Sequence, residues 1–113
     1  MERKIIYFGD YFKDFIESLN TDVREKIDYV LDMLKRLKKI NPKFIKHIRD
    51  GLFELRVAWN GNIYRVFLIF DKGNIVVLFN GFQKKSKNTP RREIEKALRI
   101  KNEYYEYKRE YDS

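Results

Sequence analysis

The chain has 113 residues, the size of one ordinary domain, and we expect a single domain over residues 1–113. Hydrophobic residues make up 43% of the sequence and aromatic residues 16%, which is enough for a packed core and argues against global disorder. The formal net charge is +8, which favours anionic partners, and the absence of cysteine excludes disulfides, thiolate nucleophiles and cysteine-bound zinc.

Nothing in the sequence indicates a membrane segment or a secretion signal. No apolar run approaches the roughly 20 residues that a membrane helix needs. The N-terminus, MERKIIYFGD, lacks the longer apolar stretch and the cleavage site of a signal peptide. We therefore expect a soluble, cytoplasmic protein with no membrane partner, and the lack of cysteine fits a reducing compartment.

The first half of the chain predicts a strand and two helices. Residues 4–8 are typical of a short strand that ends at Gly9, and the spacing of apolar residues over 12–19 indicates a brief helix. A longer amphipathic helix is expected from Thr21 to about Lys39, and Asn41-Pro42 ends it.

The second half predicts three strands and a final helix. A basic connector over 43–50 has an extended piece around Phe44-Ile45. A last helix begins at Thr89 with Pro90 in its first turn, where a missing N–H group costs nothing. The three strands are expected at 52–59, 62–70 and 74–80. The resulting order is β-α-α-β-β-β-α, an α+β fold in which an antiparallel-dominated sheet packs against two N-terminal helices and a C-terminal helix.

The positive charge is concentrated in two zones. Seven Lys/Arg and no acid lie within 35–49, and six with no acid lie within 72–92. Ordinary surface helices mix the two signs, so this segregation favours a phosphate-binding face, with nucleic acid as the first candidate ligand.

Two predicted turns place cations in register on the sheet. Asn60-Gly61 is typical of a two-residue hairpin turn, which sets Arg56 directly opposite Arg65. If Lys72-Gly73 is also a two-residue turn, Arg65 faces Asn80 on the next strand. Lys84 and Lys85 then follow the third strand.

Two like charges directly opposite each other destabilise a sheet, so the pair needs a compensating anion. An anionic ligand is one solution. The other is an internal ion network in which Glu54, two residues from Arg56 on the same face, bridges the arginines without any ligand. A longer first loop would break the pairing altogether, because turn length sets register.

The residue inventory limits the catalytic chemistry. With one histidine, no cysteine and no cluster of conventional metal ligands, metal-assisted hydrolysis is disfavoured and no cofactor is expected. Metal-free RNA cleavage needs only cations for the phosphate and groups that move protons, while the RNA 2′-hydroxyl is the nucleophile. Arg56 and Arg65 are then the phosphate clamps, and Lys84 or Lys85 is the proton-transfer or leaving-group candidate.

Other residues have plainer interpretations. His47, the sole histidine, could move a proton during cleavage, but we favour a solvated loop histidine. Phe53 and Phe67 are expected in the core, while Trp59 and Tyr64 could either pack in the core or stack on bases.

The order and spacing of several segments resemble the RelE/ParE superfamily of bacterial toxins, closest to its HigB-like, phage-derived branch. The resemblance covers roughly residues 5–100. It is carried by Gly51-Leu52-Phe53-Glu54-Leu55-Arg56, Tyr64-Arg65-Val66, Ile75-Val76-Val77-Leu78, Gly81-Phe82-Gln83-Lys84-Lys85, Thr89-Pro90, and Glu93, Ile94 and Ala97.

This resemblance implies the toxin of a type II toxin–antitoxin system, which cleaves mRNA, commonly in the ribosomal A site, and inhibits translation. It implies a cognate antitoxin, expected to be of the helix-turn-helix type, that occludes the basic face. Catalytic positions match Arg56, Arg65, Lys84 and Lys85; candidates for substrate binding are Glu54, Asn80, Lys46, Arg49 and Lys87.

The sequence departs from this family in one respect. Relatives often use a late His or Tyr for proton transfer, and none follows Lys85 before the last helix. Tyr104 or Tyr105 would serve only if that helix folds back over the site. Two alternatives therefore stay open: a ParE-like toxin that poisons DNA gyrase without cleaving RNA, and a non-catalytic RNA-binding domain.

Overall fold

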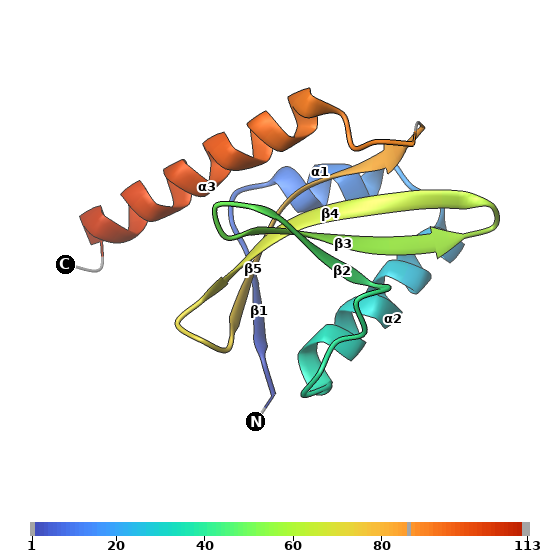
Figure 1. Cartoon of the computed structure of the whole chain (residues 1–113), viewed down its shortest axis with the longest axis horizontal. Helices are drawn as coiled ribbons and strands as arrows, with labels where there is room; N and C mark the ends of the chain where they lie inside the picture. Colours follow the sequence, from blue (N-terminus) through green and yellow to red (C-terminus); the bar gives the residue numbers. More distant parts are fainter. Residues whose placement is uncertain (1, 86, 112–113) are drawn as a thin grey trace.

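The protein folds as one five-stranded sheet covered by helices on both faces (Figure 1). The computed structural model describes residues 2–85 and 87–111. In chain order the elements are β1 (Lys4–Tyr7), α1 (Tyr11–Glu17), α2 (Thr21–Arg36), β2 (Ile45–Arg49), β3 (Leu52–Trp59), β4 (Asn62–Asp71), β5 (Ile75–Lys84) and α3 (Arg91–Tyr111).

The predicted α+β class is confirmed, with one strand more than expected. The strand order is β1-β5-β4-β3-β2, with β1 parallel to β5 and every other pair antiparallel. The extra strand is β2, where only an extended piece around Phe44-Ile45 was expected. It pairs with β3, Ile45 opposite Leu55, so contacts with β3 and not its own polar sequence make it a strand.

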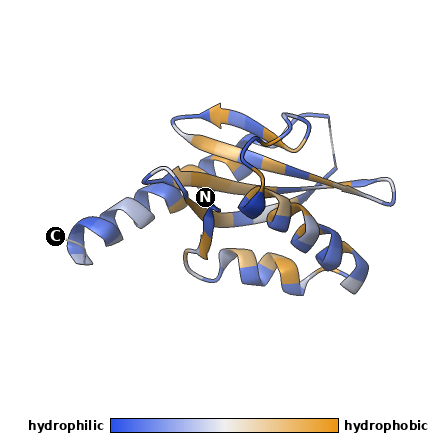
Figure 2. Cartoon of the chain, turned by 90° about the horizontal axis from the view of Figure 1, so that it is seen from below, coloured by the Kyte–Doolittle hydropathy of each residue, from blue (hydrophilic) through white to orange (hydrophobic). Residues whose placement is uncertain are grey.

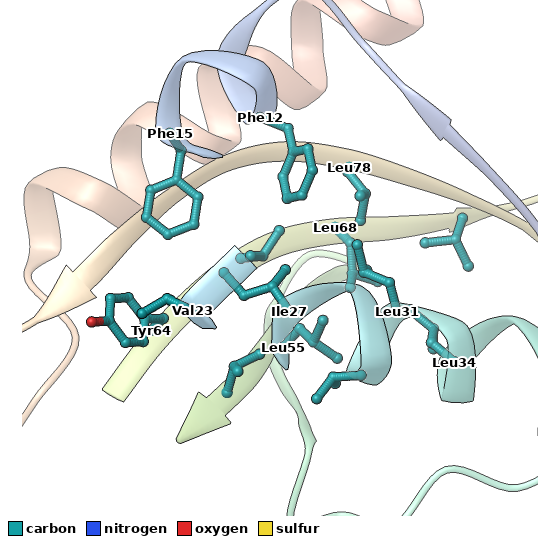
Figure 3. Close-up of a cluster of buried hydrophobic side chains, with 14 residues drawn as sticks. Phe12, Phe15, Val23, Ile27, Leu31, Leu34, Leu55, Tyr64, Leu68 and Leu78 are labelled. Carbon is teal, nitrogen blue, oxygen red and sulfur yellow. The ribbon is translucent and has the colours of Figure 1, made fainter. Parts of the chain in front are cut away.

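Helices α1 and α2 cover one face of the sheet. Their apolar side chains meet those of β3, β4 and β5 in a single cluster (Figure 3). Tyr64, left open by the sequence, belongs to this cluster and is only 5% exposed. Trp59 instead lies at the surface, where its indole N–H donates to Asp22 Oδ2 at 3.0 Å.

Helix α3 covers the opposite face. Ala97, Ile100 and Tyr104 pack there against Phe67 and Phe79 of the sheet. The sheet strands carry most of the hydrophobic colour, while the C-terminal part of α3 is mostly hydrophilic (Figure 2). The last helix begins at Arg91, two residues later than the predicted start at Thr89.

The first predicted turn is confirmed and so is its register. Asn60 and Gly61 have φ angles of 51° and 82°, as a type I′ turn requires. Trp59 pairs with Asn62, and Arg56 lies directly opposite Arg65.

The second predicted register is wrong. Asp71 pairs with Ile75, so the loop has three residues, and the pairing shifts again between Val66 and Leu68. This irregularity sets Arg65 opposite Phe82 instead of Asn80. Asn80 is 2% exposed, and within the described residues its side-chain amide has no hydrogen-bond partner.

Across residues 2–85 and 87–111, no helix is both long and apolar enough to cross a membrane.

Candidate functional site

Four neighbouring strands place charged side chains on the same face of the sheet. Lys46 of β2 pairs with Glu54 of β3, and Arg65 of β4 pairs with Phe82 of β5. Glu54 itself pairs with Phe67, two residues from Arg65, and Lys84 lies two residues beyond Phe82. Because side chains alternate along a strand, all of these positions share the face that α3 covers.

A pocket of about 290 Å³ opens at this place, between the sheet and the loop that leads into α3. Its charged and hydroxyl-bearing lining comes from strands far apart in the sequence and from that loop. The residues are Lys46, Glu54, Arg65, Lys84, Lys87 and Thr89. Four cations and one acid give the pocket a positive lining.

Glu54 organises the centre of the pocket. It is 1% exposed, its Oε1 lies 2.9 Å from Arg65 Nη1, and its Oε2 accepts a hydrogen bond of 2.8 Å from the Thr89 hydroxyl. Both carboxylate oxygens are therefore engaged within the protein. The internal ion network that was one of the two expectations is present for Glu54 and Arg65. Thr89 also belongs to it, and the sequence did not predict this, because nothing in the sequence links residues 35 positions apart.

The surroundings of Arg65 destabilise its positive charge despite its ion pair with Glu54. Burial lowers the pKa of Arg65, the positive charge of Arg56 lowers it further, and Glu54 opposes both effects. Its Nε is buried and, in the described part of the chain, has no hydrogen-bond partner. One carboxylate thus only partly compensates two facing arginines, which leaves a field that attracts anions.

Lys84 is a pocket lysine whose surroundings lower its pKa. Partial burial lowers its pKa, and the positive charges of Arg65, Lys46 and Arg56 lower it further against the opposing effect of Glu54. A lysine with a lowered pKa exchanges its proton more readily near neutral pH than an ordinary surface lysine.

The remaining predicted residues lie in the pocket lining, beside the pocket or outside it. Lys46 and Lys87 line the pocket, whereas Arg56 stands beside it, opposite Arg65. Three others lie outside its lining. Lys85 is exposed after the end of β5, Arg49 is exposed with its Nε 3.5 Å from Asp50 Oδ2, and Asn80 is buried within β5.

Of the aromatic and imidazole candidates for proton transfer, His47 of β2 lies at the pocket and Tyr104 does not. His47 lines the pocket in part, but its ring packs edge-on against Phe53 with centroids 5.0 Å apart. Tyr104 is buried and donates to Asp71 Oδ2 at 2.6 Å, and Tyr105 lies beside Tyr104. Helix α3 therefore does not bring Tyr104 to the pocket.

Among the described residues, no group of three or more histidine, aspartate and glutamate side chains is arranged to hold a metal ion.

Fold and pocket together define a small α+β protein with a cationic cavity at one end of its sheet. The family model of the phage-derived Gp49-like proteins matches residues 14–102, so the chain belongs to this family. It is a family of toxin-like proteins from toxin–antitoxin systems, which suggests an antitoxin as a partner. A comparison with curated proteins finds no significant match.

Proposed function

We propose that this chain is a RelE/HigB-like toxin that cleaves mRNA on the ribosome and thereby inhibits translation. The observation that supports the proposal is the convergence of Arg65, Lys46 and Lys84 on one pocket. At about 290 Å³ the pocket has room for a phosphate group, and it holds both fixed cations and a lysine of lowered pKa.

In the proposed reaction the RNA supplies its own nucleophile. Neutral Lys84 takes the proton of the 2′-hydroxyl, and the 2′-oxygen attacks the adjacent phosphorus. A bond from the 2′-oxygen to phosphorus forms and the bond to the 5′-oxygen breaks, which leaves a 2′,3′-cyclic phosphate. The ammonium group of Lys46 or Lys87 donates a proton to the departing 5′-oxygen.

The other cations stabilise the charge that develops on phosphorus-bound oxygens. Arg65, held by Glu54, is oriented before the substrate arrives, so it binds the phosphate without a large reorganisation. Arg56 adds to the field from the neighbouring strand position. Lys85 and Arg49, which lie outside the pocket lining, would contact flanking phosphates of the RNA.

An antitoxin would inhibit this reaction by covering the pocket. Lys46, Lys85 and Lys87 are all exposed, so an acidic segment of the antitoxin could bind them in place of RNA.

The test measures cleavage of end-labelled mRNA on translating ribosomes and, separately, of ribosome-free RNA with a metal chelator present. We expect Lys84→Gln to lower the cleavage rate by about 10²-fold or more, the usual loss when a proton-transfer group is removed. Lys13→Gln is the matched control, since it removes the same charge from an exposed position on α1, outside the pocket lining, and its rate should stay within about threefold of the parent. Equal rates for the two variants would overturn the proposed role of Lys84.

Two other outcomes would replace the proposed function. Inhibition of DNA supercoiling without RNA cleavage would identify a gyrase poison. Salt-dependent RNA affinity without cleavage would identify a non-catalytic RNA-binding domain.

A further inference from the structure

The cationic pocket has a second end whose chemistry differs from that of its charged lining. His47, Ile48 and Ile94 also line the pocket. Ile48 and Ile94 are half-buried and pack at the edge of the hydrophobic cluster beneath α3. Together with the faces of the His47 ring they form what we call the apolar end of the pocket. Apolar surface contributes nothing to binding a phosphate group, which needs positive charge and hydrogen-bond donors, so this end has another use.

An irregularity in β2 forms this apolar end. The pairing of β2 with β3 shifts between His47 and Arg49, which makes Ile48 an extra residue in the edge strand. Consecutive side chains of a regular strand point to opposite faces, yet Lys46, His47 and Ile48 all line the pocket. A bulge re-aims side chains in this way, and bulges are common beside functional sites. The His47 ring is also held in place, because it packs edge-on against Phe53 with centroids 5.0 Å apart.

The charged and apolar ends of the pocket are separated along the strands. Lys84 pairs with Ile63, close to the Asn60-Gly61 turn, so it lies at the end of the pocket nearer that turn. Ile48 lies opposite the first residues of β3, at the end of that strand farther from the turn. Arg65 lies between these two levels. A ligand that fills the pocket therefore meets positive charge at one end and apolar surface at the other.

We propose that the pocket holds one whole nucleotide, with its phosphate at the charged end and its base at the apolar end. The base stacks on the ring of His47 and packs against Ile48 and Ile94, while Arg65 and Lys84 hold the phosphate. The class of ligand rests on the proposed RNA cleavage, but the base subsite and its residues do not take part in that reaction. Because every base has a face that can stack, the subsite binds a base without selecting one sequence.

The test measures the binding of two matched ligands to the full chain by isothermal titration calorimetry. One ligand is 2′-deoxyadenosine 3′,5′-bisphosphate, and the other is the same sugar bisphosphate with hydrogen in place of the base. Neither has a 2′-hydroxyl, so binding is measured without cleavage. We expect the ligand with the base to bind at least about tenfold more tightly, which is the usual gain from stacking one base. Equal affinities for the two ligands would overturn the proposal.

Two substitutions of His47 locate the base. His47→Ala should weaken binding of the ligand with the base by about tenfold and leave binding of the abasic ligand unchanged. His47→Phe keeps an aromatic ring without the imidazole nitrogens and should restore most of the affinity. Tyr29→Ala is the control, since it removes an exposed ring from α2, outside the pocket lining, and it should change neither affinity. Equal losses for both ligands in His47→Ala would show that the imidazole binds phosphate, which contradicts the base subsite.

Cleavage assays on the same protein separate the base subsite from the proposed function. A parent protein that prefers the ligand with the base but cleaves no RNA would refute the proposed cleavage and support the base subsite. A parent protein that cleaves mRNA but binds the two ligands equally would refute the base subsite and leave the cleavage standing. The two proposals can therefore fail independently.

Discussion

Glu54 and Arg65 form a buried ion pair, with 2.9 Å between Oε1 and Nη1, at the centre of the cationic pocket. The second oxygen of Glu54 accepts a hydrogen bond from the Thr89 hydroxyl, so both oxygens of this carboxylate already have partners within the protein. A carboxylate would also repel a phosphate. Glu54 is therefore better understood as the residue that positions Arg65, in contrast to the substrate-binding role expected from the sequence.

The Glu54→Gln variant tests this interpretation through stability. The substitution leaves the Arg65 guanidinium without its counter-charge and directly opposite Arg56, so we expect a loss of about 3–5 kcal/mol in the free energy of unfolding, typical of a broken buried ion pair. Urea denaturation measures it. The double variant Glu54→Leu/Arg65→Leu should lose much less than the sum of its single changes. A Glu54→Gln protein as stable as the parent would show that the pair contributes nothing.

The lowered pKa of Lys84 predicts a pH dependence for RNA cleavage. A general base must be neutral, so the cleavage rate should rise with pH and level off once the pH exceeds the pKa of Lys84. This pKa lies below the ordinary lysine value of about 10.4. Rate profiles under single-turnover conditions measure this rise. Lys84→Arg keeps the positive charge but cannot lose its proton in this range, so its residual rate should not follow the same curve. A parent rate that does not change with pH would rule out Lys84 as the base.

Much of the site geometry was predictable from local turn chemistry. Asn60-Gly61 adopts the two positive φ angles of a type I′ turn, and that turn alone fixes Arg56 opposite Arg65. The next hairpin was not predictable in this way. Lys72 and Gly73 also have positive φ angles, but a third residue joins the loop and a later register shift moves Asn80 away from Arg65.

Contacts between distant segments explain what the sequence left undetermined. Strand β2 has a polar sequence and is ordered by its pairing with β3, so its propensity did not reveal it. Thr89 was predictable as the start of a helix, but its hydrogen bond to Glu54 depends on how the loop before α3 returns to the sheet. Burial, which lowers the pKa of Lys84, likewise appears only when four strands are assembled.

Thr89 connects the loop before α3 to the centre of the pocket, and its substitution tests that connection. Thr89→Val keeps the shape but leaves Glu54 Oε2 without its donor, so we expect a loss of about 1–3 kcal/mol in stability. Thr89→Ser restores the hydroxyl and should recover most of the loss. Thermal or urea unfolding of the three proteins measures both effects. If Thr89→Val is as stable as the parent while Thr89→Ser is destabilised, the methyl group and not the hydrogen bond is what matters.

Gly81 is required by the ring of Phe15. A Cβ atom built at residue 81 would lie 2.4 Å from Phe15 Cδ2, well inside van der Waals contact. Because the neighbour is a ring packed in the core, we expect Gly81→Ala to cost about 1–3 kcal/mol, as overpacking usually does. The double variant Gly81→Ala/Phe15→Leu should cost less than the two single changes added together. Strict additivity in urea denaturation would show that the backbone, and not Phe15, rejects the methyl group.

At the other end of the sheet, Asp71 ties the end of β4 to α3. Its Oδ2 accepts hydrogen bonds from the Tyr104 hydroxyl at 2.6 Å and from Lys108 Nζ at 2.7 Å. Burial alone would raise the pKa of Asp71, but the bonds from Lys108 and Tyr104 outweigh it, and the pKa lies below its ordinary value. The folded state therefore holds this proton more weakly than the unfolded chain does.

The stabilisation by Asp71 should consequently disappear in acid. It is fully present above the unfolded pKa of about 3.9 and is lost as pH falls through the lower folded value. We expect Asp71→Asn to cost about 1–3 kcal/mol at pH 7, and its difference from the parent to shrink as the pH falls below about 4. Denaturation curves over this pH range measure the difference. A constant Asp71→Asn deficit at every pH would mean that ionisation of Asp71 does not stabilise the fold.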